Sequence, residues 1–275
     1  MHEGSIAATF LIVFRETLEA SLIVGIILTA ISRLGQTRFF PHVIWSSVCA
    51  VFASLIAGMI LMSLTESAKE NVEKIIEATI SIVACGILTY MVFWMAQQAR
   101  KIRSDLEVRV EQAVTSGEFF AIVLLPFLSV FREGAETVLF LKAVAIQNSG
   151  LVSFWGGILG FGLAAGMASA IFIGGKKIPL RPFFQWTGYF ILLIAAGLLA
   201  YGIHELHELG WIPPVIEPVW NINHILNEKE GLGSFLKALF GYNGNPSLVE
   251  VMAYASYLIV ISWFLRPKQT VPSRV

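Results

Sequence analysis

Charged residues are scarce in this 275-residue chain, where they make up 14% of the sequence against 56% hydrophobic residues. Soluble globular domains carry about 25% charged residues and roughly 45–50% apolar ones. Together with a mean hydropathy of +0.73, this shortage of charge predicts an integral membrane protein with the lipid bilayer as its surroundings. The net charge is zero, which argues against a nucleic-acid partner.

Cysteine is nearly absent too, since Cys49 and Cys85 are the only two. Both fall in apolar runs, so we interpret them as small buried hydrophobic residues, and we expect neither a disulfide framework nor a thiolate metal site. The first residues, MHEGSIAA, lack a basic region. The first apolar run is therefore interpreted as a retained span and not as a cleaved signal peptide.

Seven apolar segments are long enough to cross a bilayer. They are continuous and do not alternate between apolar and polar residues, which excludes the strands of a membrane barrel and predicts helices. The sequence thus predicts an all-α polytopic membrane protein whose residues 1–275 form one transmembrane domain. The predicted spans are 5–31, 43–64, 72–96, 118–147, 151–173, 183–206 and 247–265. Two further helices are predicted at membrane surfaces, over 99–116 and 233–242.

Basic residues gather after the first, third, fifth and seventh spans, and the alternate loops are poor in them. The basic clusters are Arg33 and Arg38; Arg100, Lys101, Arg103 and Arg109; Lys176, Lys177 and Arg181; and Arg266, Lys268 and Arg274. Because cytoplasmic loops carry an excess of lysine and arginine, the N-terminus is predicted outside and the C-terminus in the cytosol.

Charge does occur inside two of the spans, in a repeated motif. Phe10, Leu11, Val13, Phe14, Arg15, Glu16 and Glu19 recur 117 positions later as Phe127, Leu128, Val130, Phe131, Arg132, Glu133 and Glu136. In the predicted topology the two copies run in opposite directions, which indicates a 3+3 inverted repeat with a seventh span added. Inverted repeats tend to place a binding site near the bilayer midplane, where corresponding helices meet.

The charged residues of each copy share one helical face, because Glu16 and Glu19 are three residues apart and Arg15 and Glu19 four. Six such groups facing lipid would cost on the order of 15–20 kcal/mol, so they must face one another or water. If they converge, four carboxylates and two guanidinium groups leave a formal charge of −2, which suits a multivalent cation. Carboxylate oxygens favour magnesium, calcium, manganese and iron, and do not select Cu(I).

A structural interpretation competes with this one. Each copy can form an internal salt bridge that locks helices together. One arginine then neutralises one glutamate, and the second glutamate has no partner of opposite charge unless it is protonated.

Acidic residues also open the third span. Glu66, Glu70, Glu73 and Glu77 follow one another at spacings of four, three and four, so they share a helical face. We interpret them as a funnel that gathers cations at the outer mouth. The alternative is an ordinary polar helix start, which fits Glu73 and Glu77 less well because these two lie deeper among apolar neighbours.

Two more groups of candidate residues lie on helices. In YGIHELHELGW the spacing of His204, His207 and Glu208 permits a shared metal ion, although a polar helix end at the lipid headgroups explains it equally well. Met91 and Met95 are interpreted as core residues. Glycines in the fifth span, at four-residue spacings, predict close helix packing; they are Gly156, Gly160, Gly162 and Gly166.

With these residues in view, the chain resembles the oxidase-dependent iron permeases, a family that includes a fungal high-affinity permease and bacterial EfeU-type transporters. The resemblance rests first on the two R-E-x-x-E motifs, RETLE at 15–19 and REGAE at 132–136. It extends through ILTYMVFWM at 87–95, LEVRVEQAV at 106–114, AAGLLAYGIHELHE at 195–208 and FGYNGNPSLVEV at 240–251. It covers nearly the whole chain.

The resemblance implies a multi-pass protein of the cell (inner) membrane that transports iron into the cytoplasm, with iron as substrate and no prosthetic group. It implies that the arginine and the two glutamates of each motif translocate iron. The family's acidic motif in the third span matches Glu73 and Glu77 less closely. It also implies an extracytoplasmic partner that handles or oxidises iron. Three alternatives remain: transport of another hard divalent ion such as manganese; a scaffolding protein; and a membrane di-iron oxidase, whose sites contain Glu-x-x-His motifs. Neither motif copy contains histidine.

Overall fold

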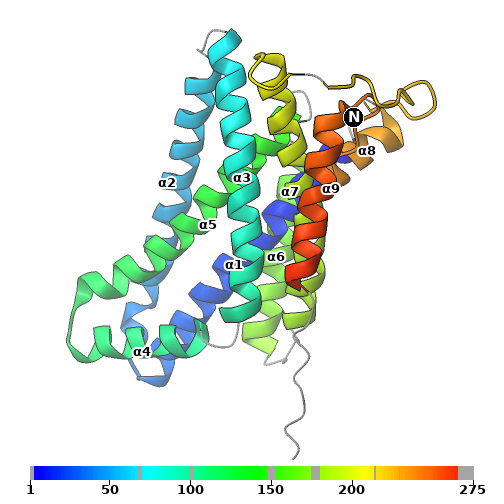
Figure 1. The fold of residues 1–275 in the computed structure, drawn as a ribbon. Coiled ribbons are helices and arrows are strands. Elements are labelled where there is room, and N and C mark those ends of the chain that lie inside the picture. The colour runs from blue at the N-terminus through cyan, green and yellow to red at the C-terminus, as the bar shows by residue number, and fades with distance from the viewer. Residues whose placement is uncertain are drawn as a thin grey trace, which may run out of the picture.

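The computed structural model describes residues 3–66, 70–98, 102–147, 153–174, 180–213, 215–228 and 230–265 (Figure 1). All regular secondary structure in these ranges is helical. The elements are α1 (Glu3–Arg33), η1 (Thr37–Phe39), α2 (Phe40–Glu66), α3 (Glu70–Gln98), α4 (Ile102–Thr115), α5 (Phe119–Gln147), α6 (Phe154–Gly174), α7 (Leu180–Glu208), α8 (Gly231–Phe240) and α9 (Leu248–Leu265). The predicted all-α polytopic class is confirmed.

Five of these helices are both long and apolar enough to cross a membrane, and they cover residues 37–63, 71–95, 154–172, 185–208 and 248–265. The other two predicted spans correspond to α1, with 31 residues, and α5, with 29. Their lengths of roughly 45 Å exceed the hydrocarbon thickness, but their middle turns hold the charged motifs. The count of seven spans therefore stays a prediction that depends on where those charges point.

The two motif helices run antiparallel and lie side by side, tilted relative to α2, α3 and α9 (Figure 1). The start of α1, the start of α3, the end of α7 and the start of α9 lie at one end of the bundle. The short helix α4 lies across the opposite end, where α1 also finishes. Helices are present at both predicted positions, as α4 and α8, and α8 packs against α1; their location at a membrane surface stays a prediction.

Helix packing crosses between the two halves of the chain. The first motif helix, α1, packs against α6, while the second, α5, packs against α2; α3 and α7 pack against each other. Exchanging the halves reproduces this pattern, as an inverted repeat predicts. The aromatic pairs preceding the charges agree as well: Phe10 stacks on Phe14 with centroids 5.6 Å apart, and Phe127 on Phe131 at 6.0 Å.

Small residues let these helices approach closely. A Cβ atom on Gly160 would lie 2.8 Å from the carbonyl oxygen of Phe10, so only glycine fits there. At the α2–α5 contact, the Ser46 hydroxyl donates to the carbonyl oxygen of Val123 at 2.6 Å. The predicted packing role is confirmed for Gly156 and Gly160, which face α1. It is wrong for Gly162 and Gly166, where an added Cβ would meet nothing within 4 Å among the described residues.

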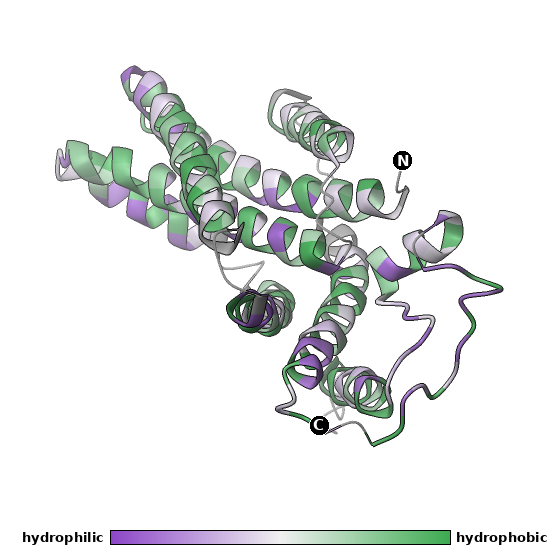
Figure 2. Ribbon diagram, turned by 90° about the horizontal axis from the view of Figure 1, so that it is seen from above, coloured by the Kyte–Doolittle hydropathy of each residue, from purple (hydrophilic) through white to green (hydrophobic). Residues whose placement is uncertain are grey.

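The outer surface of the bundle is strongly apolar. Large side chains on α2, α6 and α9 are exposed, for example Trp45, Phe161 and Trp263. Figure 2 shows the helices mostly in green, whereas purple is more frequent along the connection between α7 and α8. Such a surface is stable in lipid and unfavourable in water. Cys49 lies on this exposed surface, so its expected burial is wrong, whereas Cys85 is buried.

Candidate metal site

The first motif is buried almost completely. Arg15 and Glu16 each have 2% of their side chain exposed, and Glu19 has 5%. The Arg15 guanidinium contacts both carboxylates, with Nη1 2.8 Å from Glu16 Oε1 and Nη2 2.9 Å from Glu19 Oε1. Nη1 also donates to the Met91 sulfur of α3 at 3.2 Å. The Arg15–Glu19 contact follows from helical spacing, because residues i and i+4 lie on one face.

The second motif makes the same internal contacts in a more open setting. The Arg132 guanidinium pairs with Glu133 Oε1, and its Nε lies 3.6 Å from Glu136 Oε1. Glu133 is 2% exposed, but Glu136 is 20% and Arg132 50% exposed. The guanidinium of Arg132 lies over the ring of Trp94 in α3, 5.5 Å from its centroid. One helix, α3, therefore contacts the arginines of both motifs.

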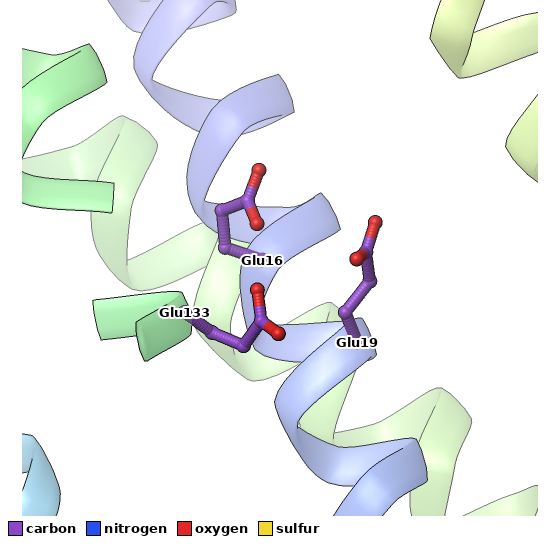
Figure 3. A group of neighbouring side chains, drawn as sticks. All are labelled: Glu16, Glu19 and Glu133. Carbon is purple, nitrogen blue, oxygen red and sulfur yellow. The ribbon is translucent and has the colours of Figure 1, made fainter. Parts of the chain in front are cut away.

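The carboxylates of the two motif helices converge. Glu16 and Glu19 from α1 and Glu133 from α5 each offer an oxygen within 4.8 Å of the others (Figure 3). Glu16 Oε2, Glu133 Oε2 and Glu136 Oε2 are buried and have no hydrogen-bond partner in the described part of the chain. Buried carboxylate oxygens without partners are unfavourable. A cation bound within the group would give Glu16 and Glu133 the partner that these oxygens lack.

Each arginine contacts both glutamates of its own copy. The expectation that an internal salt bridge leaves one glutamate of each copy without an arginine is therefore wrong. The arginines still do not reach every oxygen, and the four carboxylates outnumber them. Three clustered carboxylates form a hard-oxygen donor set of the kind that binds divalent cations.

Of the acidic residues predicted for the outer mouth, Glu73 and Glu77 lie on the same helix, α3, whereas Glu66 lies on α2. Glu73 is exposed on α3, and Glu77 is partly buried and accepts a hydrogen bond from the Tyr201 hydroxyl of α7 at 3.1 Å. Glu66 ends α2 and does not continue the face of α3. Neither Glu73 nor Glu77 belongs to a metal-sized carboxylate group within the described residues.

The residues at the end of α7 are engaged separately. His204 Nδ1 lies 3.0 Å from Glu250 Oε1 of α9, and its Nε2 lies 3.3 Å from Glu208 Oε1. Lys74 of α3 donates to Glu208 Oε2 at 2.7 Å. His207 faces Glu217 instead, at 3.5 Å. The arrangement links three helices, and these residues do not converge on one point in the described structure.

Comparison with known proteins accounts for nearly the whole chain. The family model of the iron permease FTR1 family matches residues 6–267. The chain belongs to the iron permease FTR1 family.

Curated relatives of this permease carry the name ferrous iron permease EfeU. The relative from Yersinia pestis is 37% identical over 270 residues, which cover 97% of this chain and 96% of that protein. Those from Escherichia coli O6:H1 (strain CFT073) and Shigella sonnei (strain Ss046) are each 33% identical over 264 residues, 94% of this chain and 95% of theirs. No solved structure matches the chain significantly. The prediction of a transporter and not an enzyme is confirmed.

The sequence reading of this permease missed two buried glutamates. Glu205 is 6% exposed in α7, and Glu250 is 4% exposed near the start of α9. The sequence did carry a signal for Glu250, because Ser247 and Glu250 form a capping box: the Ser247 amide donates to Glu250 Oε1 at 3.4 Å, and the Glu250 amide donates to the Ser247 hydroxyl oxygen at 3.4 Å. Met91 was assigned to the core, where it lies, but its bond to Arg15 was not foreseen.

Proposed function

We propose that this permease carries ferrous iron across the cell membrane into the cytoplasm through the carboxylate group of Glu16, Glu19 and Glu133. The observation that supports the proposal most is the convergence of three buried carboxylates from the two motif helices. Family membership supports iron as the ion. The curated relatives are named for ferrous iron, which supports Fe(II) as the transported form.

The arginines have a defined part in this proposal. Arg15 and Arg132 neutralise part of the carboxylate charge while the site holds no ion, and they keep the binding of a cation weak enough for release. Glu136 lies beside the group and serves as a neighbouring ligand on the more open side, together with Arg132. The outer residues Glu73 and Glu77 gather cations before they enter.

The proposed membrane arrangement is seven spans, with α1 and α5 completing the five apolar ones. Arg15, Glu16, Glu19 and Glu133 are enclosed by protein, which lowers the cost of placing them at membrane depth, and the half-exposed Arg132 lies over Trp94 of α3. In this arrangement the N-terminus lies outside and α4 in the cytoplasm. For a bacterial permease of this kind the membrane is the inner one, and an extracytoplasmic iron-handling protein delivers the ion. His204, His207 and Glu208 lie at the outer end in this arrangement, where they contribute to cation capture.

The test is iron uptake by cells that express Glu16→Gln or Glu133→Gln. Loss of a ligand should reduce uptake at least as much as the roughly 10–100-fold loss that follows removal of an outer-shell partner at metal sites. Glu111→Gln provides the matched control, because Glu111 is exposed on α4, away from the motifs. Normal uptake by either motif variant, with the protein present in the membrane, would exclude these carboxylates from the path.

The second candidate function is transport of another hard divalent ion such as manganese, which the three-carboxylate donor set favours as much as iron. Uptake of radioactive manganese by proteoliposomes, with ferrous iron as competitor, separates the two. The oxidase alternative has lost its basis with the family membership.

A further inference from the structure

Met91 lies at the edge of the carboxylate group. Its sulfur accepts a hydrogen bond from Arg15 Nη1 at 3.2 Å, and the same nitrogen donates to Glu16 Oε1 at 2.8 Å. The sulfur is therefore no more than 6.0 Å from that carboxylate oxygen, the sum of the two distances. The Met91 side chain is 6% exposed, so α3 brings a thioether to a site whose other donors are all oxygens.

Packing alone does not explain this contact. A thioether is a weak hydrogen-bond acceptor, yet a buried guanidinium directs a nitrogen at it. The Arg15 Nε atom, meanwhile, is buried with no hydrogen-bond partner among the described residues. The bond to the sulfur is the weakest of the contacts that hold Arg15, so the sulfur itself loses little when it exchanges the guanidinium for another partner.

The chemistry of the carboxylates creates a need for such a donor. Three carboxylates bind magnesium, calcium, manganese and ferrous iron alike, because all accept hard oxygen ligands. A thioether is a softer donor, which the later and softer transition ions accept more readily than calcium or magnesium does. A sulfur beside the carboxylates thus favours ferrous iron over harder divalent ions.

We propose that Met91 is a specificity-determining residue, whose sulfur pairs with Arg15 in the ion-free site and with the ferrous ion when one is bound. This inference rests on the proposed function, since it requires the ion to occupy the carboxylate group. It adds α3 to the two motif helices as a third wall of the site.

The experiment measures ferrous iron uptake by proteoliposomes, under reducing conditions, against increasing manganese or calcium. In Met91→Leu the competing ions should inhibit at concentrations lower by about tenfold, an effect comparable to the loss of one partner at a metal site. Met91→Gln, which offers a hard oxygen, should shift preference the same way. Met95→Leu is the matched control, because Met95 lies one turn further along α3, packed against the core.

The competition ratio is taken within each variant, so a smaller amount of folded protein does not alter it. If Met91→Leu and Met91→Gln both keep the wild-type ratio, Met91 is a packing residue and the inference is overturned. Glu16→Gln is measured in parallel to separate the two proposals. Wild-type uptake by that variant contradicts the proposed function, whereas lost uptake combined with an unchanged ratio in the Met91 variants contradicts only the role of the sulfur.

Discussion

Two arginines in identical motifs have unequal surroundings. Arg15 is enclosed by Glu16, Glu19 and Met91, while Arg132 is half exposed and lies over Trp94. A buried guanidinium is stable only if its fork matches its acceptors, and a half-exposed one keeps part of its hydration. The inequality means that the site is closed around the first motif and more open around the second.

This difference predicts unequal effects of the same substitution. Arg15→Lys replaces a fork that reaches both carboxylates with a single ammonium group, and iron uptake should fall by about tenfold or more, which corresponds to ~1.4 kcal/mol. Arg132→Lys should lose less, because the exposed ammonium group stays hydrated. Uptake rates normalised to the amount of permease in the membrane test this, and equal losses in both variants would contradict it.

At the residue scale, the sequence predicted which side chains share a face but not which would be buried. The four-residue spacing of Arg15 and Glu19 predicts their contact. Nothing in the spacing separates Glu136 from Glu19, although Glu136 is the more exposed and lies outside the close group. That difference is a tertiary effect, because α1 packs against α6, α8 and α4 as well as α5, and the sequence pattern does not contain it.

At the scale of elements, the fold depends on close contact between helices of different halves. The predicted helix positions agree with the structure because long apolar runs determine them. Their partners were not predictable, since α2, α6 and α9 are apolar on all sides and present no stripe that indicates a neighbour. Only the small residues mark the contacts, and of Gly156, Gly160, Gly162 and Gly166 only the first two do so.

Two substitutions in α6 should therefore have opposite effects on stability. Gly160→Ala places a methyl group 2.8 Å from the Phe10 carbonyl oxygen and 3.0 Å from the Phe14 amide nitrogen, so α1 and α6 must separate. Overpacking of this kind costs about 1–3 kcal/mol. Gly162→Ala meets open space and should gain roughly 0.5–1 kcal/mol from its better helix propensity.

Thermal unfolding of both variants in detergent provides the measurement. The melting temperature should fall for Gly160→Ala and stay level or rise for Gly162→Ala. The same shift in both would mean that the α1–α6 contact does not control stability. Iron uptake by Gly160→Ala should fall as well, because the displaced α1 carries Glu16 and Glu19.

At the scale of the whole molecule, the crossed packing of α1 on α6 and α5 on α2 makes the two halves interdependent. Neither motif helix has its main neighbour in its own half, so a half expressed alone lacks the surfaces that bury its charges. The topology itself was inferred from loop charge, and the fold agrees with it to the extent that α4 lies at the end of the bundle opposite the start of α3.

The orientation leads to a labelling prediction. Single cysteines are placed by Glu111→Cys in α4 and by Asn221→Cys between α7 and α8, in a background with Cys49 and Cys85 replaced by serine and alanine. Both positions are exposed. Because lysine and arginine gather at the α4 end, that end should face the cytoplasm. A membrane-impermeant maleimide should then label position 221 in spheroplasts, and position 111 only after the membrane is opened.

The control is the cysteine-free background, which should not react in either preparation. The reverse labelling pattern would mean that the α4 end faces outward, and the proposed direction of transport would then be inverted. Labelling of both positions in intact spheroplasts would place α4 and the α7–α8 connection on the same side of the membrane, with an even number of spans between them. In that case α5, which carries the charged second motif and is not among the five apolar spans, would not cross the membrane, and Glu133 could not meet Glu16 and Glu19 at the midplane.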